Sequence, residues 1–180
     1  MKITIATLAN KRPDFIELQY RSIEQYVKDE QVEYVVFNNA FDDRRRFNAI
    51  EDICRTLGIR SIPVKGKDFG NVCETVAYSL NKIWKHQLSS ISGILTLIDS
   101  DMFFIKDIRI ENLMHGYDFG FVPSYRGSSF EVQYPWTGLM FFNMDTLPEV
   151  STLRWNIGRV LGHRVDVGGL NHYYLQKHMS

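Results

Sequence analysis

The stretch Gly93-Ile94-Leu95-Thr96-Leu97-Ile98-Asp99-Ser100-Asp101-Met102-Phe103-Phe104 decides how this chain is expected to fold. Its first half is almost continuously apolar, which is typical of a strand buried on both faces of a sheet. The apolar run ends in two carboxylates, Asp99 and Asp101, separated by one residue. Because strand side chains alternate between faces, we expect the two acids to point the same way and Ser100 to point the other way.

The paired acids are a candidate metal site. Two like charges at the end of a strand repel each other unless a cation lies between them. Mg²⁺ is typically held by one or two carboxylates together with substrate phosphates, and Mn²⁺ also prefers oxygen ligands. In an open α/β sheet, ligands bind at the carboxyl ends of the strands. Asp99 and Asp101 therefore predict a site for Mn²⁺ or Mg²⁺, and the alternative is a solvated strand end whose acids cap a turn.

The composition is ordinary for a globular protein, because 44% of the 180 residues are hydrophobic and 23% are charged. The formal net charge of +0 argues against a nucleic-acid partner or an acidic membrane surface. No stretch is long enough to cross a bilayer, and the alternating N-terminal residues do not resemble a signal peptide. Cys54 and Cys73 are too few for a disulfide framework. These features predict one cytoplasmic domain with reduced thiols.

Helical and strand patterns alternate along the first half of the chain. The apolar pattern predicts helices over residues 14–27, 42–58 and 71–86, and strands over Ile3–Ala9, 32–37, 59–65 and 93–98. Asp14 is expected to cap the first of these helices and Gly58 to end the second. This alternation is typical of a parallel sheet with right-handed crossovers, and the default ligand of such a sheet is a nucleotide.

The pattern changes after Asp101. We expect a short helix over residues 108–114 and strands over 118–123 and 139–143, with residues 125–129 in a loop between them. Residues 153–161 are predicted to be helical, and the chain closes with a helix that includes Tyr174 and Leu175.

Three stretches of the sequence together resemble the GT-A fold glycosyltransferases. Asp99-Ser100-Asp101 is similar to the Asp-x-Asp motif of that fold. The stretch Trp136-Thr137-Gly138-Leu139-Met140-Phe141-Phe142-Asn143-Met144-Asp145 resembles the Asn-Ser-Gly-containing strand of the glycogenin and galactosyltransferase-like retaining family. Asp166-Val167-Gly168-Gly169-Leu170-Asn171 resembles that family's Asp-Gln-Asp-x-Leu-Asn, with Val167 and Gly168 at the positions of the Gln and the second Asp.

The resemblance implies a GT-A fold, which is a Rossmann-like α/β fold of nucleotide-diphospho-sugar transferases. It is built on a mixed, mostly parallel sheet flanked by helices. We expect residues 1–180 to form one such domain, with a nucleotide-binding half over 1–104 and a sugar and acceptor half over 105–180. The implied activity is that of a hexosyltransferase-like enzyme. It would move a sugar from a nucleotide-diphospho-sugar, UDP in preference to GDP, to a hydroxyl of a glycan, protein or small-molecule acceptor.

The resemblance also implies roles for individual acids. Asp101 would ligate Mn²⁺ or Mg²⁺ directly, and Asp99 would hold the ribose or share the ion. Asp166 is the candidate acid at the reacting centre. It would be the general base of an inverting enzyme, or it would hold the sugar or act as nucleophile in a retaining one. His172 and His178 are possible third metal ligands.

Other positions are expected to contact the donor. Trp136 would stack on a sugar ring, and Gly138 would let the backbone approach that sugar closely. Lys65 or Lys67 could reach the diphosphate. The remaining positions are Thr7, Ala9, Asn10, Asn38, Gly70, Asn71, Ser100 and Thr137.

Two other functions remain open from the sequence. A sugar-phosphate nucleotidyltransferase also uses an α/β sheet with metal-binding acids, but residues 8–13 after the first strand contain no glycine for a phosphate loop. A catalytically degenerate nucleotide-sugar-binding domain is the non-enzymatic alternative.

Overall fold

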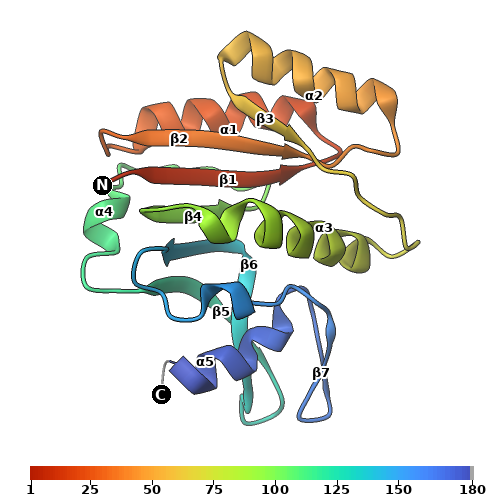
Figure 1. Ribbon diagram of the computed structural model, residues 1–180, viewed down its shortest axis with the longest axis vertical. Coiled ribbons are helices and arrows are strands. Elements are labelled where there is room, and N and C mark those ends of the chain that lie inside the picture. Colours follow the sequence, from red (N-terminus) through yellow and green to blue (C-terminus); the bar gives the residue numbers. More distant parts are fainter. Residues whose placement is uncertain (179–180) are drawn as a thin grey trace.

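The chain folds around a six-stranded sheet in the order β3-β2-β1-β4-β6-β5, and the computed structural model describes residues 1–178 (Figure 1). β1, β2, β3 and β4 are parallel, whereas β6 runs antiparallel to both β4 and β5. The strands span β1 (Ile3–Ala9), β2 (Val32–Asn38), β3 (Arg60–Pro63), β4 (Ile94–Ile98), β5 (Phe119–Arg126) and β6 (Val132–Asn143). The predicted mixed, mostly parallel α/β sheet is confirmed.

Helices cover both faces of this sheet (Figure 1). α1 (Pro13–Tyr26) and α2 (Arg44–Leu57) pack on one face, and α3 (Val72–His86) packs on the other. Each helix buries an apolar stripe: for example, Leu80, Ile83 and Trp84 of α3 are almost fully buried. Within residues 1–178, every helix is too short or too polar to span a bilayer.

The helix ends follow local chemistry, with one correction. α2 ends at Gly58, which adopts the left-handed conformation (φ 68°) as predicted. The prediction that Asp14 caps α1 is wrong, because the helix already begins at Pro13. Proline fits the first helical position since it has no N–H to satisfy there. The Asp14 carboxylate instead pairs with Arg12 at 2.6 Å.

The predicted helix over residues 153–161 is wrong. A single 3₁₀ turn (Val150–Thr152) is followed by extended chain and a hairpin of β7 (Gly158–Val160) and β8 (His163–Val165). The hairpin turns at Leu161 and Gly162, which both have positive φ (48° and 83°). Two such residues favour a tight hairpin turn whose twist matches the flanking strands.

The region around the sheet edge is also more extended than expected. Residues 125 and 126, predicted as loop, belong to β5, and β6 begins at Val132 instead of residue 139. A register shift between Phe121 and Pro123 accommodates the proline, which has no N–H for the ladder. The predicted helix over 108–114 is the short α4 (Ile110–Leu113), and the last predicted helix is α5 (His172–His178).

Candidate active site

The acid pair lies at the carboxyl end of β4, as its sequence context predicts. Asp99 is the first residue after the strand, and the chain turns at once because the Met102 N–H donates to the Asp99 carbonyl at 3.1 Å. The Asp99 N–H in turn donates to the Gly138 carbonyl of β6 at 2.9 Å. The side chains of Asp99 and Asp101 are exposed, and that of Ser100 is half-buried. The pair therefore stands on a turn that is fixed to two strands.

The electrostatics of the pair favour a cation. Burial of the carboxyl by the atoms packed around it, and secondly the negative charge of Asp101, raise the pKa of Asp99 to about 6, although its side chain still reaches solvent. Within the described residues, no Lys, Arg or His side chain lies within 4.0 Å of either carboxylate to form an ion pair. Two oxygen-ligand groups without a protein counter-ion fit a divalent cation that takes its remaining ligands from donor phosphates and water.

His172 and His178, named above as possible third metal ligands, do not join the acid pair. Among residues 1–178, no three His, Cys, Asp or Glu side chains are close enough together to hold a metal. His172 is almost fully buried, and its Nδ1 lies 2.9 Å from the Gln133 carbonyl oxygen. His178 packs against Tyr174 and lies 3.6 Å from Glu149. Both histidines are held by neighbours in the C-terminal part of the chain and complete no site with the aspartates.

Trp136 and Gly138 of β6 form one wall beside the acid pair. A Cβ built on Gly138 would lie 2.2 Å from the Trp136 ring, so the indole occupies the space where a side chain would be. The indole is nevertheless 39% exposed. Because Gly138 accepts the Asp99 hydrogen bond, this partly open aromatic face lies next to the start of the acid-bearing turn.

Asp166 lies next to the N-terminal end of α3. Burial first, and then the nearby Asp166 carboxylate, raise the pKa of the Cys73 thiol on that helix. Asp166 Oδ1 accepts from the Val167 N–H at 2.8 Å, and its side chain remains exposed. Gly168 follows with φ 79°, and a Cβ there would approach the Thr137 methyl at 3.4 Å. The third motif thus packs beside the second motif at Thr137.

The residues expected to contact a base or ribose are mostly engaged within the protein. The side chains of Thr7 and Ala9 are fully buried or nearly so. The Asn38 amide is also buried: Nδ2 donates to Glu51 at 2.7 Å, and Oδ1 accepts from the Ala40 N–H at 3.2 Å. These three side chains are not available to a ligand, so they are left out of the donor site proposed below. Asn10 is half-buried, and its Oδ1 accepts from Arg46 at 3.4 Å.

The start of α3 is closed by its own cap. Asn71 Oδ1 accepts from the N–H groups of Cys73 (2.9 Å) and Glu74 (3.4 Å), so these two amides of the first helical turn are already used. Gly70 precedes this cap with φ 69°. Lys65 is exposed, and Lys67 Nζ lies over the Phe69 ring at 4.9 Å from its centroid.

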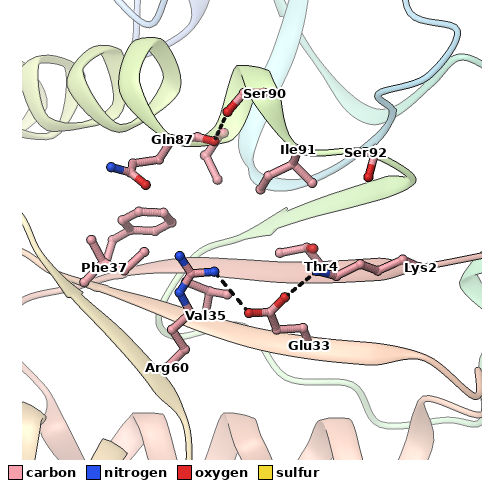
Figure 2. A pocket seen from close by; sticks show the side chains of 12 residues that line it. Lys2, Thr4, Glu33, Val35, Phe37, Arg60, Gln87, Ser90, Ile91 and Ser92 are labelled. Carbon is pink, nitrogen blue, oxygen red and sulfur yellow. Dashed lines mark hydrogen bonds and ion pairs between the residues drawn. The ribbon is translucent and has the colours of Figure 1, made fainter.

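Several cavities in the described part of the chain lie away from the acid pair. One of them has a volume of about 230 Å³ near the amino ends of β1 and β2, where Figure 2 shows Glu33 between Lys2 and Arg60. Glu33 pairs with Lys2 at 2.8 Å and with Arg60 at 3.2 Å, so one carboxylate is shared by two cations. Four further cavities in the described part of the chain, like this one, are not lined by Asp99, Asp101 or Asp166. The candidate site is an open edge of the sheet.

Comparison with known proteins places this architecture among the GT-A glycosyltransferase folds. No protein-family model and no curated protein matches the sequence. Among solved structures, the galactosyltransferase LgtC in complex with donor and acceptor sugar analogs is similar with a TM-score of 0.59 and 14% identity, over 95% of this chain and 70% of that one. The mannosyltransferase PcManGT from Pyrobaculum calidifontis, in complex with GDP-Man and Mn²⁺, has a TM-score of 0.51 and 15% identity.

The second similarity is partial in both directions. It covers 79% of this chain and 44% of the mannosyltransferase chain, so this chain spans less than half the length of that relative. At such identities the comparisons establish the fold. That fold is a mixed, largely parallel α/β sheet flanked by helices.

Proposed function

We propose that this chain is a metal-dependent glycosyltransferase that takes a sugar from a nucleotide-diphospho-sugar. The observation that carries the proposal is the position of Asp99 and Asp101. They lie directly after the fourth strand of a GT-A sheet, and the pKa of Asp99 is raised to about 6 by partial burial and by its acidic neighbour. A carboxylate pair at this edge with no basic partner among residues 1–178 is a suitable holder for Mn²⁺ or Mg²⁺. Both similar structures are those of glycosyltransferases, and one of them contains Mn²⁺.

In this mechanism Asp101 would ligate the cation, and Asp99 would share the cation or hold the ribose. When bound, the cation neutralises charge that develops on the departing nucleoside diphosphate. The open face of Trp136 is the surface on which a sugar ring would stack, since its apolar face can meet sugar C–H groups. Gly138 leaves room for the indole to lie in this position, because any side chain there would displace the ring.

Asp166 is the acid proposed for the reacting centre. It is exposed, and its turn packs beside Thr137, the neighbour of Trp136. It shares no three-residue acidic or histidine cluster with the metal pair among residues 1–178, so we assign it to the sugar or the acceptor hydroxyl instead of the cation. It would act as general base in an inverting reaction, or hold the sugar or attack it in a retaining one.

The test is a melting-temperature and hydrolysis screen. Mn²⁺ with UDP or GDP, and with UDP- or GDP-sugars, should raise the melting temperature of the full chain, and EDTA should abolish the shift. Asp101→Asn should lose the shift. Asp107→Asn is the matched control, because Asp107 is an exposed carboxylate paired only loosely with Lys28 at 3.5 Å. Slow hydrolysis of a bound nucleotide-sugar should follow the same metal requirement.

Each other outcome has a distinct meaning. Release of pyrophosphate from a nucleoside triphosphate and a sugar phosphate would identify a nucleotidyltransferase. Donor binding with neither hydrolysis nor transfer to any acceptor would identify a binding domain. Equal nucleotide binding by wild type and Asp101→Asn, with and without metal, would contradict the proposed site.

A further inference from the structure

One face of α1 contacts the turn that carries the acid pair and the residues that follow it. Phe15, Gln19 and Ser22 are spaced so that they lie on the same side of the helix. Phe15 packs edge-on against Phe103, with ring centroids 5.6 Å apart. Ser22 Oγ accepts from the Phe104 N–H at 3.3 Å. Gln19, between them, reaches the turn itself.

The Gln19 amide binds both ends of that turn. Nε2 donates to the carbonyl oxygen of Asp99 at 2.9 Å and to that of Met102 at 2.7 Å. Both amide hydrogens are thereby used on the two residues that bracket the acid-bearing segment. Gln19 is only 1% exposed, so no solvent competes for these bonds. Together with the Asp99–Gly138 bond, the amide fixes the turn from the helix side and from the strand side.

Tyr34 of β2 fixes the orientation of the amide. Its hydroxyl donates to Gln19 Oε1 at 2.6 Å. Burial raises the pKa of Tyr34 far above its usual range, so the hydroxyl keeps its proton at every working pH. A donor at Oε1 leaves Nε2 facing the two carbonyls, which can only accept. A flipped or missing amide would take this donor away from both carbonyls, and the Asp99 carbonyl would then keep only the Met102 N–H.

We propose that Gln19 and Tyr34 are positioning residues that hold the Asp99–Met102 turn in the geometry needed to bind a divalent cation and a nucleoside diphosphate. The inference rests on the proposed function. Two exposed carboxylates that repel each other would move apart on a loose turn, and a metal site works only when its ligands are held within about 0.5 Å of the required positions. An apolar helix stripe would serve packing equally well, so a buried amide at this position is explained by the turn it binds.

The test compares Gln19→Met and Tyr34→Phe with Tyr174→Phe in the full chain. Methionine keeps the length of Gln19 without its donors. Tyr174 is the matched control, because it is also a buried tyrosine that donates one hydrogen bond, to the Pro148 carbonyl at 2.6 Å in the C-terminal part of the chain. We expect both test variants to weaken the binding of Mn²⁺ with UDP or GDP by about 10–100-fold, as is typical when a residue that orients metal ligands is lost.

A second readout needs no metal. Amide hydrogen exchange of the Asp99 and Met102 N–H groups should accelerate in Gln19→Met and Tyr34→Phe beyond any change in global stability, and should follow global stability alone in Tyr174→Phe. Should Gln19→Met fail to fold, Tyr34→Phe carries both readouts. Unchanged exchange and unchanged affinity in these variants would overturn the inference. A wild type that binds neither metal nor nucleotide would overturn the proposed function, and the exchange result would then still decide whether the turn is restrained by Gln19.

Discussion

The backbone N–H of Asp99 donates a 2.9 Å hydrogen bond to the carbonyl oxygen of Gly138. These residues are 39 positions apart in the sequence numbering, and each belongs to a different stretch of functional interest. Their bond extends the β4–β6 ladder by one step beyond the end of β4 and ties the start of the acid-bearing turn to β6. The Trp136 ring lies over the same glycine, so acid pair and aromatic face share one corner.

Gly138→Ala is expected to damage this corner. A Cβ would lie 2.2 Å from the indole, so the ring must leave its place. We expect a loss of about 1–3 kcal/mol in the free energy of unfolding, the usual cost of forcing extra atoms into packed structure, together with weaker binding of nucleotide-sugars. Urea unfolding measures the first effect and calorimetry the second. Gly120→Ala on β5 is the control, since its Cβ would meet the Met114 sulfur at 3.2 Å and Phe141 at an ordinary contact distance of 3.6 Å. Equal stability of the two variants would refute the packing argument.

Asp99 should make the metal-free protein less stable as pH rises. Its pKa in the folded state, about 6, is above the unfolded value of 3.8, so the folded state binds more protons between these values. The free energy of unfolding therefore decreases from about pH 4 to pH 6, and the penalty is fully present above pH 6. Asp99→Asn should remove this slope and stabilise the metal-free protein above pH 6, while weakening Mn²⁺ binding. Denaturant midpoints measured from pH 4 to 8 check this; an unchanged slope in the variant would show that other groups cause it.

Metal binding should show the opposite pH dependence. If Asp99 shares the cation as proposed, it does so in its ionised form, so Mn²⁺ affinity is expected to fall as pH decreases through about 6. Calorimetric titrations of Mn²⁺ with UDP or GDP between pH 5 and 8 measure the midpoint. Asp107→Asn should retain the wild-type profile, and an affinity independent of pH in wild type would argue that Asp99 is not a ligand.

Trp136 and Trp155 should respond to mutation in different ways. Trp155 is fully buried against Trp84 and Phe142, so Trp155→Ala is expected to cost about 3–5 kcal/mol of stability. Trp136 is 39% exposed, so Trp136→Ala should cost clearly less, but it should weaken binding of the nucleotide-sugar more than that of the free nucleoside diphosphate. Unfolding curves and paired titrations separate the effects. An identical loss of affinity for both ligands would exclude stacking of the sugar on Trp136.

Asp166→Asn should separate chemistry from metal binding. Asp166 belongs to no metal-sized cluster with Asp99 and Asp101 within residues 1–178. We expect the variant to keep its affinity for Mn²⁺ with UDP or GDP and to lose about 10²–10⁴ in the transfer or hydrolysis rate, the range for a positioned acid or base. Asp101→Asn should instead lose affinity. A loss of metal affinity in Asp166→Asn would move this residue into the cation site.

The fold could be predicted from the sequence where local patterns and tertiary packing agree. The apolar run before Asp99 and the left-handed Gly58 are local signals, and both elements formed as predicted. The helix prediction for residues 153–161 failed because Leu153 and Trp155 are two residues apart, a spacing that buries both on one side of extended chain but not on one face of a helix. The deciding signal was Gly162, whose positive φ completes a two-residue hairpin turn.

The candidate site could be predicted less completely. A strand end marks which residues lie at the carboxyl edge, but it does not say which way each side chain points. Asn38 illustrates the limit, because its side-chain amide donates a hydrogen bond to Glu51 of α2 and does not face a ligand. Gln19 illustrates the converse, because a polar residue in the buried stripe between Ile16 and Ile23 is a signal in the sequence for a buried hydrogen-bond network.

The sequence alone determined the order of strands and helices up to β4, the parallel arrangement of that half and the acid pair at the end of β4, because these depend on local periodicity and on alternation along a strand. Only the tertiary structure decided what surrounds the pair. These neighbours are the Gly138 carbonyl of β6, the side-chain amide of Gln19 and the indole of Trp136, which packs over Gly138. Those contacts join residues far apart in the chain, and their geometry is fixed by side-chain packing that periodicity does not encode.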